Sequence, residues 1–180
     1  QHKYKKHKIW QGIGNQPRKM KQMNKPLTFL LSLTFLFLFS GSVYGGDLQE
    51  GWNAYKNNDY KKAYKLWLPL AEQGNVVAQY NLGHMYEKGK GVPQDYKEAV
   101  KWYRLSAEQG NAQAQYQLGV MYDNGWGVPQ DNVLAHMWFN LSGSNGKENA
   151  AESRNYIEKK MSKQQIEKAQ EMARNWKPKK

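Results

Sequence analysis

The chain of 180 residues contains no cysteine. This absence excludes disulfide bonds, thiol catalysis and cysteine-ligated zinc, and it excludes a lipid attached through an N-terminal cysteine. We therefore expect a fold that is held together by packing alone. A chain of this size buries enough surface for a stable core without cross-links.

Acidic residues are absent from the first 45 positions, which carry eight of the 27 lysines and arginines. Residues 46–180 carry the other 19 basic residues and all 15 acidic ones, a net charge of +4 against +12 for the whole chain. Beyond the short tail of Lys177, Lys179 and Lys180, no stripe of one sign remains. We therefore expect no binding to nucleic acid.

The sequence also lacks the motifs of several common catalytic sites, such as GxSxG, HExxH or a phosphate-binding glycine loop. Its two histidines beyond the N-terminal region, His84 and His136, lie on different predicted helices and do not form a ligand set. Asp59, Asp95 and Asp131 are interpreted as helix caps. We therefore predict no catalytic residues, no cofactor and no metal, and a protein that is not an enzyme.

Residues 23–45 have the form of a secretory signal peptide, with Lys25, an apolar run over residues 27–39 and small residues after it. The apolar run is shorter than the roughly 20 residues of a membrane-spanning helix. Cleavage near Gly45 or Gly46 is therefore favoured over an uncleaved anchor. We expect a periplasmic or secreted protein with no stable membrane anchor after cleavage.

Residues 1–22 are lysine-rich and begin with glutamine, which is unusual ahead of a signal peptide. We interpret them as upstream sequence or an overextended gene prediction. Met23 or Met20 is then the expected initiator.

The most informative feature is an internal repeat. Residues 71–106 read AEQGNVVAQYNLGHMYEKGKGVPQDYKEAVKWYRLS, residues 107–142 read AEQGNAQAQYQLGVMYDNGWGVPQDNVLAHMWFNLS, and they match at 22 of 36 positions without a gap. A repeat of this length is typical of solenoids, in which each unit buries its apolar face against its neighbours.

Each repeat predicts two helices. In the first copy a helix over residues 76–88 follows the cap Asn75 and ends at Gly89 and Gly91. A second helix begins after Asp95, where Glu98 three residues on suggests a capping box, and ends near residue 110.

The pattern continues in both directions. It predicts a degenerate first unit at 48–70 and a capping unit at 143–176 with a more polar outer face. The capping unit closes with a helix that begins at Ser162 and Gln165 and folds back over the last repeat. The total is about eight helices in four antiparallel pairs.

The motif AEQGNxxAQYxLGxMYxxGxGVPQDxxxAxxWxxLS resembles the Sel1-like repeat, an α/α unit similar to the tetratricopeptide repeat but with a longer turn. The resemblance covers residues 48–176. It implies an all-α fold, an α/α solenoid that forms a tetratricopeptide-like superhelix, and a scaffold for a protein or peptide partner.

A cysteine-rich branch of this family is associated with envelope hydrolases of the β-lactamase type. Those proteins staple each repeat with a disulfide, which this chain does not have, so this alternative is disfavoured.

Several repeated residues are interpreted as packing positions. Gly83 and Gly119 lie in the middle of helices, where glycine costs about 1 kcal/mol relative to alanine. We expect the backbone of the paired helix to pass too close there for a Cβ atom. Six aromatic residues are expected to fill the spaces between units: Tyr86, Trp102, Tyr103, Tyr122, Trp138 and Phe139.

In tetratricopeptide-like stacks the first helix of each unit lines the concave face. The resemblance and the helical spacing place there Val77, Tyr80, His84, Glu87 and Lys88, with the counterparts Gln113, Tyr116, Val120, Asp123 and Asn124. Four of these five pairs differ in residue type while the packing positions are kept. A partner-binding face would show this variation, and so would a neutral solvated one.

Trp126 stands in the turn between two glycines of the second repeat, where the first repeat has Lys90. Its ring is either tucked under the next unit or exposed as a contact. An exposed ring would also suit a carbohydrate or peptidoglycan ligand.

Overall fold

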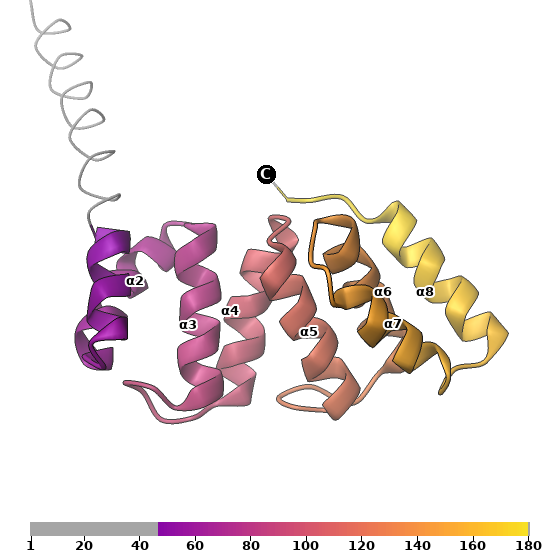
Figure 1. Ribbon diagram of the computed structural model, residues 1–180, viewed down its shortest axis with the longest axis horizontal. Coiled ribbons are helices and arrows are strands. Elements are labelled where there is room, and N and C mark those ends of the chain that lie inside the picture. The colour runs from indigo at the N-terminus through magenta and orange to yellow at the C-terminus, as the bar shows by residue number, and fades with distance from the viewer. Residues whose placement is uncertain (1–46, 180) are drawn as a thin grey trace, which may run out of the picture. The chain divides into compact units, whose positions relative to one another are not determined.

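The structure is a computed structural model that describes residues 47–179, so the predictions for residues 1–22 and 23–45 lie outside it. Between residues 47 and 179 it contains eight helical segments and no strand, which confirms the all-α prediction. The first segment is residues 47–56. The others, which follow one another in Figure 1, are α2 (Tyr60–Glu72), α3 (Val76–Lys88), α4 (Tyr96–Glu108), α5 (Ala112–Asn124), α6 (Asn132–Ser144), α7 (Ala150–Glu158) and α8 (Lys163–Asn175).

The bounds of α3 and α5 are set by the same local chemistry. The side chains of Asn75 and Asn111 each accept a hydrogen bond, 2.9 Å long, from the backbone N–H three residues on. Both helices end at a glycine with positive φ, 63° at Gly89 and 69° at Gly125, which closes the last turn. The predicted helix at 76–88 is therefore confirmed.

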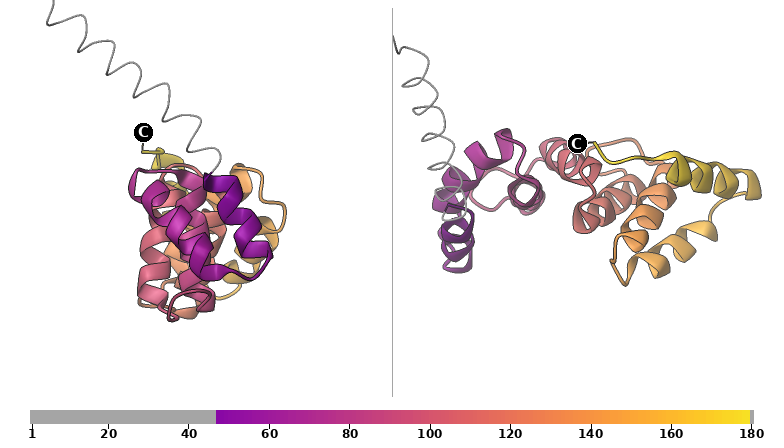
Figure 2. Two further views of the ribbon diagram at one scale, coloured as in Figure 1. Left: turned by 90° about the vertical axis from the view of Figure 1, so that its left-hand side faces the viewer. Right: turned by 90° about the horizontal axis from the view of Figure 1, so that it is seen from above.

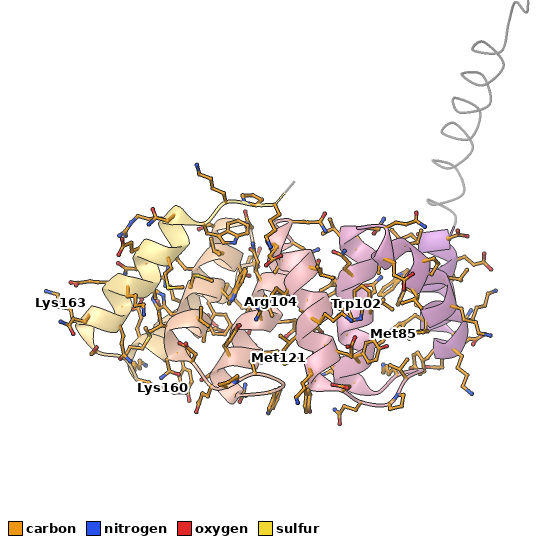
Figure 3. All side chains as sticks on the ribbon, turned by 180° about the vertical axis from the view of Figure 1, so that it is seen from behind. Met85, Trp102, Arg104, Met121, Lys160 and Lys163 are labelled. Carbon is orange, nitrogen blue, oxygen red and sulfur yellow. The ribbon has the colours of Figure 1, made fainter. Side chains whose placement is uncertain are left out.

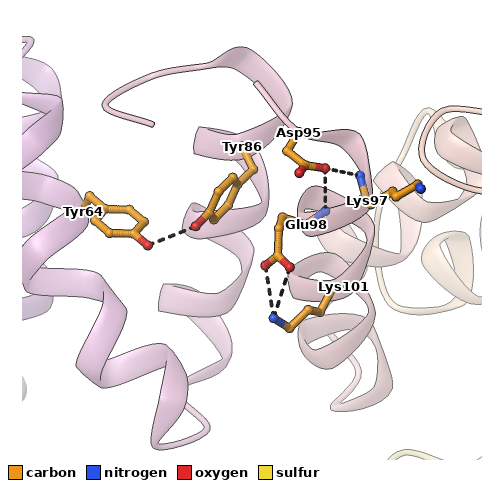
Figure 4. A network of polar contacts seen from close by, with 6 residues as sticks. All are labelled: Tyr64, Tyr86, Asp95, Lys97, Glu98 and Lys101. Carbon is orange, nitrogen blue, oxygen red and sulfur yellow. Dashed lines mark hydrogen bonds and ion pairs between the residues drawn. The ribbon is translucent and has the colours of Figure 1, made fainter. Parts of the chain in front are cut away.

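The capping box predicted at the start of α4 forms only in part, as Figure 4 shows. The carboxylate of Asp95 accepts hydrogen bonds from the backbone N–H groups of Lys97 and Glu98, at 2.8 and 3.1 Å. Glu98 does not return the contact and instead pairs with Lys101 at 3.1 Å. The backbone N–H of Asp95 has another acceptor, the carbonyl of Tyr86 at 3.0 Å, so the reciprocal bond is not needed.

The start of α8 has the complete box that the sequence predicts. Ser162 Oγ accepts from the backbone N–H of Gln165 at 3.3 Å, and the side chain of Gln165 accepts from the backbone N–H of Ser162 at 2.8 Å. Both otherwise unpaired donors at this helix end are thereby satisfied.

The helices pack in chain order, α3 on α4 and α5 on α6, with α2 on α3 and α4 on α5 joining the units. Figure 2 shows this succession from two further sides. Met85 and Met121, labelled in Figure 3, occupy equivalent buried positions 36 residues apart. Each unit therefore contributes the same positions to the core, which forms two buried clusters with Tyr86 packed against both.

Gly83 and Gly119 are required by side chains and not by a neighbouring backbone. A Cβ atom on Gly83 would lie 2.5 Å from Cδ1 of Tyr103, and one on Gly119 would lie 2.5 Å from Cε1 of Phe139. The expected close approach is thus confirmed, but the interpretation that the paired backbone causes it is wrong. The aromatic ring of the second helix packs against the glycine of the first helix and leaves no room for a methyl group.

The predicted aromatic positions lie within or between the units. Tyr86 is half-buried and its hydroxyl lies 3.0 Å from that of Tyr64 in the preceding unit (Figure 4). The other five are at most 8% exposed: Trp102, Tyr103, Tyr122, Trp138 and Phe139. These side chains form structural core, as the sequence predicts.

Two buried serines connect the second helix of each unit to the first. Ser106 Oγ donates to the carbonyl of Val76 at 2.8 Å, and Ser142 Oγ donates to the carbonyl of Ala112 at 2.7 Å. Both serines are fully buried. The repeated bonds satisfy the buried serine hydroxyls and link the two helices of each unit at the same place.

The C-terminal part departs from the predicted fourth antiparallel pair, because α7 and α8 both pack on α6 and not mainly on each other. Trp176 meets the ring of Trp138 edge to face, with centroids 6.3 Å apart. The chain then reaches back to α4, where the backbone N–H of Lys179 donates to the carbonyl of Glu108 at 2.7 Å. As predicted, the last helix covers the final repeat.

Candidate partner-binding face

The first helices of successive units, residues 47–56 and α3, border a groove together with the start of α5. Its volume is about 450 Å³. The lining residues carry amide, aromatic and apolar side chains and no formal charge: Leu48, Gln49, Trp52, Val77, Tyr80, Asn81, Asn111 and Gln113. We call this surface the groove.

A smaller cavity of about 120 Å³ adjoins the groove and shares Trp52, Tyr80 and Asn81 with it. Its other lining residues are Tyr55, Trp67 and His84. We call it the aromatic pocket, because rings supply most of its walls. The shared residues make the groove and the aromatic pocket one continuous surface.

A second groove of about 370 Å³ lies between α5 and the capping unit. It is lined by Tyr116, Val120, Asp123, Phe139, Glu152, Ser153 and Tyr156. Unlike the first groove, it contains carboxylates.

Four of the predicted face residues line the first groove or the aromatic pocket: Val77, Tyr80, His84 and Gln113. Val77 is 46% exposed, while Tyr80 and His84 are half-buried. Burial raises the pKa of the Tyr80 hydroxyl. Burial also lowers the pKa of His84, whose Nδ1 is hydrogen-bonded to the hydroxyl of Tyr55 at 3.1 Å.

Glu87 does not face outward, which corrects the sequence-based placement. It is only 5% exposed and accepts a hydrogen bond of 2.6 Å from the hydroxyl of Tyr103. Its neighbour Lys88 is exposed, as predicted, but folds over to pair with the Glu87 carboxylate at 2.6 Å. Glu87 therefore faces α4, where the hydroxyl of Tyr103 donates a hydrogen bond to its carboxylate.

Among the α5 counterparts, Tyr116, Val120 and Asp123 line the second groove. The hydroxyl of Tyr116 lies 3.1 Å from Oγ of Ser153 in α7. Asp123 accepts from Lys160 at 3.2 Å. The side chain of Asn124, although exposed, donates to the carbonyl of Val120 in its own helix at 2.9 Å. Contacts to the capping unit thus already occupy part of this face.

Trp126 is partly exposed, and its ring packs on the preceding unit and not under the next one, as one of the two expectations placed it. Its ring stacks on Tyr96 of α4, with centroids 5.4 Å apart and planes 15° apart, yet the residue remains 39% exposed. Lys90 has the equivalent place in the preceding turn, with its ammonium 5.0 Å from the ring centroid of Tyr60. In both repeats the turn residue covers the tyrosine that begins the preceding second helix.

Part of the face was not predicted, although the 36-residue spacing of the repeat indicates it. Leu48 and Trp52 lie 36 residues before His84 and Lys88, which were assigned to the face. On the other side, Glu152 and Tyr156 lie 36 residues after Tyr116 and Val120. Extending the face by one repeat in each direction would have found all four.

Between residues 47 and 179, no group of three or more histidine, aspartate or glutamate side chains is placed to hold a metal ion. In the same part of the chain, no helix combines the length and apolar character needed to cross a membrane.

Comparison with known proteins agrees with this architecture. The family model described as "Sel1 repeat" matches three consecutive segments, residues 46–75, 76–111 and 112–147. The chain therefore belongs to the Sel1 repeat family. Proteins built from such repeats commonly act as scaffolds for protein interaction.

Two solved structures resemble the chain. One is a protective antigen present in uropathogenic Escherichia coli strains that displays an SLR fold, with 34% identity and a TM-score of 0.71 over 74% of this chain. Another is a Sel1 repeat protein from Oxalobacter formigenes, with 29% identity and a TM-score of 0.60 over 69% of this chain. The matches span 29% and 55% of those two proteins, so this chain corresponds to only part of each. No curated protein matches the chain.

Proposed function

We propose that this protein is an exported, non-catalytic scaffold that binds a protein or peptide through the face formed by residues 47–56, α3 and α5. One observation carries this proposal: the groove and the aromatic pocket form a continuous surface that joins two repeats. Its aromatic side chains offer a large contact area at low entropic cost, and aromatic residues dominate binding energy at interfaces.

The contacts of the titratable groups on this face support binding in preference to chemistry. Nδ1 of His84 is hydrogen-bonded to Tyr55. The carboxylate of Glu87 is buried against Tyr103 and Lys88. Both side chains are therefore held in contacts within the fold.

Export is proposed from the signal-peptide form of residues 23–45. Expression of the natural gene followed by mass measurement of the protein in the periplasmic and medium fractions tests it. A mass that starts at residue 46 or 47 supports export. An uncleaved chain found only in the cytoplasm contradicts it.

Pull-down from the fraction that contains the protein tests the binding face. We expect a partner retained by the wild type to be lost in the double variant Tyr80→Ala and Tyr116→Ala. Because both tyrosines are half-buried, Val77→Glu serves as a second variant at a more exposed position. Leu105→Ala, 39% exposed on α4 and outside the grooves, is the matched control.

Two outcomes contradict the proposal. Equal retention of the partner by the folded double variant and by Val77→Glu would show that this face does not bind the partner. Covalent labelling by a fluorescent penicillin, with turnover, shows a hydrolase of the β-lactamase type instead of a scaffold.

A further inference from the structure

The aromatic pocket has the size of one side chain. Its volume of about 120 Å³ is well below the roughly 300 Å³ at which small-molecule sites begin. Its walls include the rings of Trp52, Tyr55 and Trp67, and Trp52 is itself 42% exposed. An apolar side chain would gain most from such a pocket, because it would be enclosed by rings on several sides.

The adjoining groove suits the backbone around such a side chain. Amide side chains line it, from Gln49 and Asn81 to Asn111 and Gln113. An amide side chain can both donate and accept hydrogen bonds, as a peptide backbone does. Two of these groups are already in use within the chain, because Oδ1 of Asn111 accepts from the backbone N–H of Ala114 and Nε2 of Gln49 donates to Asn53. The groove therefore favours an extended segment whose anchoring residue points into the aromatic pocket.

Two lysines lie beside the rings of the pocket. Nζ of Lys56 is 5.3 Å from the ring centroid of Trp52, and Nζ of Lys90 is 4.9 Å from that of Tyr55. These distances bring both ammonium groups within reach of a ligand that contacts the rings.

Neither lysine has a carboxylate partner in the part of the chain that the structure describes. The ion pairs among residues 47–179 include neither Lys56 nor Lys90, and residues 1–46 contain no aspartate or glutamate. The nearby carboxylate of Glu87 is buried and paired with Lys88. The surroundings of the pocket therefore carry uncompensated positive charge.

We infer that the partner segment is an acidic peptide, with one apolar side chain in the aromatic pocket and adjacent carboxylates at Lys56 and Lys90. This inference rests on the proposed function and names the chemistry of the partner at the same face. Complementary charge of this kind speeds association and rejects wrong partners, and salt screens it.

Selection from a random-peptide phage library on the full immobilised chain tests the inference, with the Tyr80→Ala variant selected in parallel. We expect the wild type to enrich peptides in which aspartate or glutamate flanks leucine, isoleucine, phenylalanine or methionine. Enriched peptides with neutral or basic flanks overturn the inference but leave the proposed function standing. No enrichment over Tyr80→Ala contradicts the proposed function itself.

Fluorescence anisotropy with one enriched acidic peptide then tests the two lysines. The double variant Lys56→Glu and Lys90→Glu is expected to weaken binding roughly tenfold at low salt and to remove most of its salt dependence. Replacing the peptide's carboxylates by amides is expected to have a similar effect on the wild type.

The matched control changes the same charge elsewhere, with Lys159→Glu after α7 and Lys168→Glu in α8, both exposed. An equal loss in this control overturns the inference, because the effect would then come from net charge alone. Unchanged binding in the Lys56 and Lys90 double variant also overturns it. So does a neutral oligosaccharide that binds the wild type when no peptide is enriched.

Discussion

The hydroxyl of Tyr103 donates a hydrogen bond of 2.6 Å to Oε2 of Glu87, and both residues are buried. Thirty-six residues on, the same two positions hold Phe139 and Asp123. Phe139 has no hydroxyl, and Asp123 turns to Lys160 in the capping unit. The two positions therefore change together between repeats.

The first unit has a third combination of residues at these two positions. There the equivalent positions hold Trp67 and Gly51. The indole of Trp67 packs where a side chain at Gly51 would stand, and its Nε1 donates to the carbonyl of Leu48 at 3.2 Å. The largest of the three rings, Trp67, is thus paired with the smallest of the three partner residues, Gly51.

The bond between Tyr103 and Glu87 predicts a measurable coupling. Tyr103→Phe removes a donor from a buried carboxylate and is expected to lower the free energy of unfolding by about 1–3 kcal/mol. In a double-mutant cycle with Glu87→Ala, measured by urea unfolding, we expect a coupling energy of about 0.5–3 kcal/mol. Tyr156→Phe, at a residue 56% exposed, is the control and should change stability by less than about 0.5 kcal/mol. Additive effects would show that the bond contributes nothing to stability.

The helical glycines predict opposite signs for one chemical change. Gly83→Ala and Gly119→Ala place a methyl group 2.5 Å from an aromatic ring and should each destabilise the fold by about 1–3 kcal/mol. Gly143→Ala is the matched control in α6, since its Cβ would meet only Ala150 at 3.8 Å. It should stabilise by up to about 1 kcal/mol, because alanine is the better helix former. Thermal and urea unfolding measure both, and a stabilising Gly83→Ala would refute the packing reason.

The buried serine bonds predict a cost for losing a single hydroxyl. Ser142→Ala leaves the carbonyl of Ala112 without its side-chain donor and should lower the free energy of unfolding by about 1 kcal/mol. Ser144→Ala removes an exposed hydroxyl that bonds within its own helix, so its effect should be smaller. Equal effects of the two substitutions in urea unfolding would contradict this account.

The environment of His84 predicts a dependence of stability on pH. Burial lowers its pKa in the folded chain below the ordinary value of 6.5, so the unfolded chain binds the proton more readily. Stability should therefore fall as pH drops below about 6.5 and level off below the folded pKa. Unfolding free energies measured across this range should show a shallower slope for His84→Gln than for the wild type. An identical slope in the two proteins would exclude this contribution.

Much of the fold could be predicted because its signals are local and repeated. Asn75, Gly89 and Ser162 specify helix ends through bonds within a few residues, and the structure confirms them. The interpretation of Gly83 was wrong in one respect, the neighbour that comes close. A glycine at this position indicates a close contact, but the sequence does not show whether a backbone or a side chain makes it. The prediction of a fourth antiparallel pair was wrong because α7 and α8 both pack on α6, and long-range packing determines this arrangement.

The face was predicted only in part, and its binding role remains a prediction. Helical spacing placed Tyr80 and Val77 correctly on the surface but placed Glu87 there too. Spacing along one helix does not show that the hydroxyl of Tyr103, on the neighbouring helix, binds the Glu87 carboxylate in the interior. The aromatic pocket also needed Trp52 and Trp67, which come from the degenerate unit where the repeat pattern is weakest.

The sequence by itself determined the repeat, its helices, the family and the positions reserved for packing, because each depends on residues that recur 36 positions apart. Only the tertiary structure decided which side chains meet across units. Lys90 beside Tyr55, Glu87 beneath Tyr103 and α8 on α6 are contacts between segments whose distance in space no local pattern encodes.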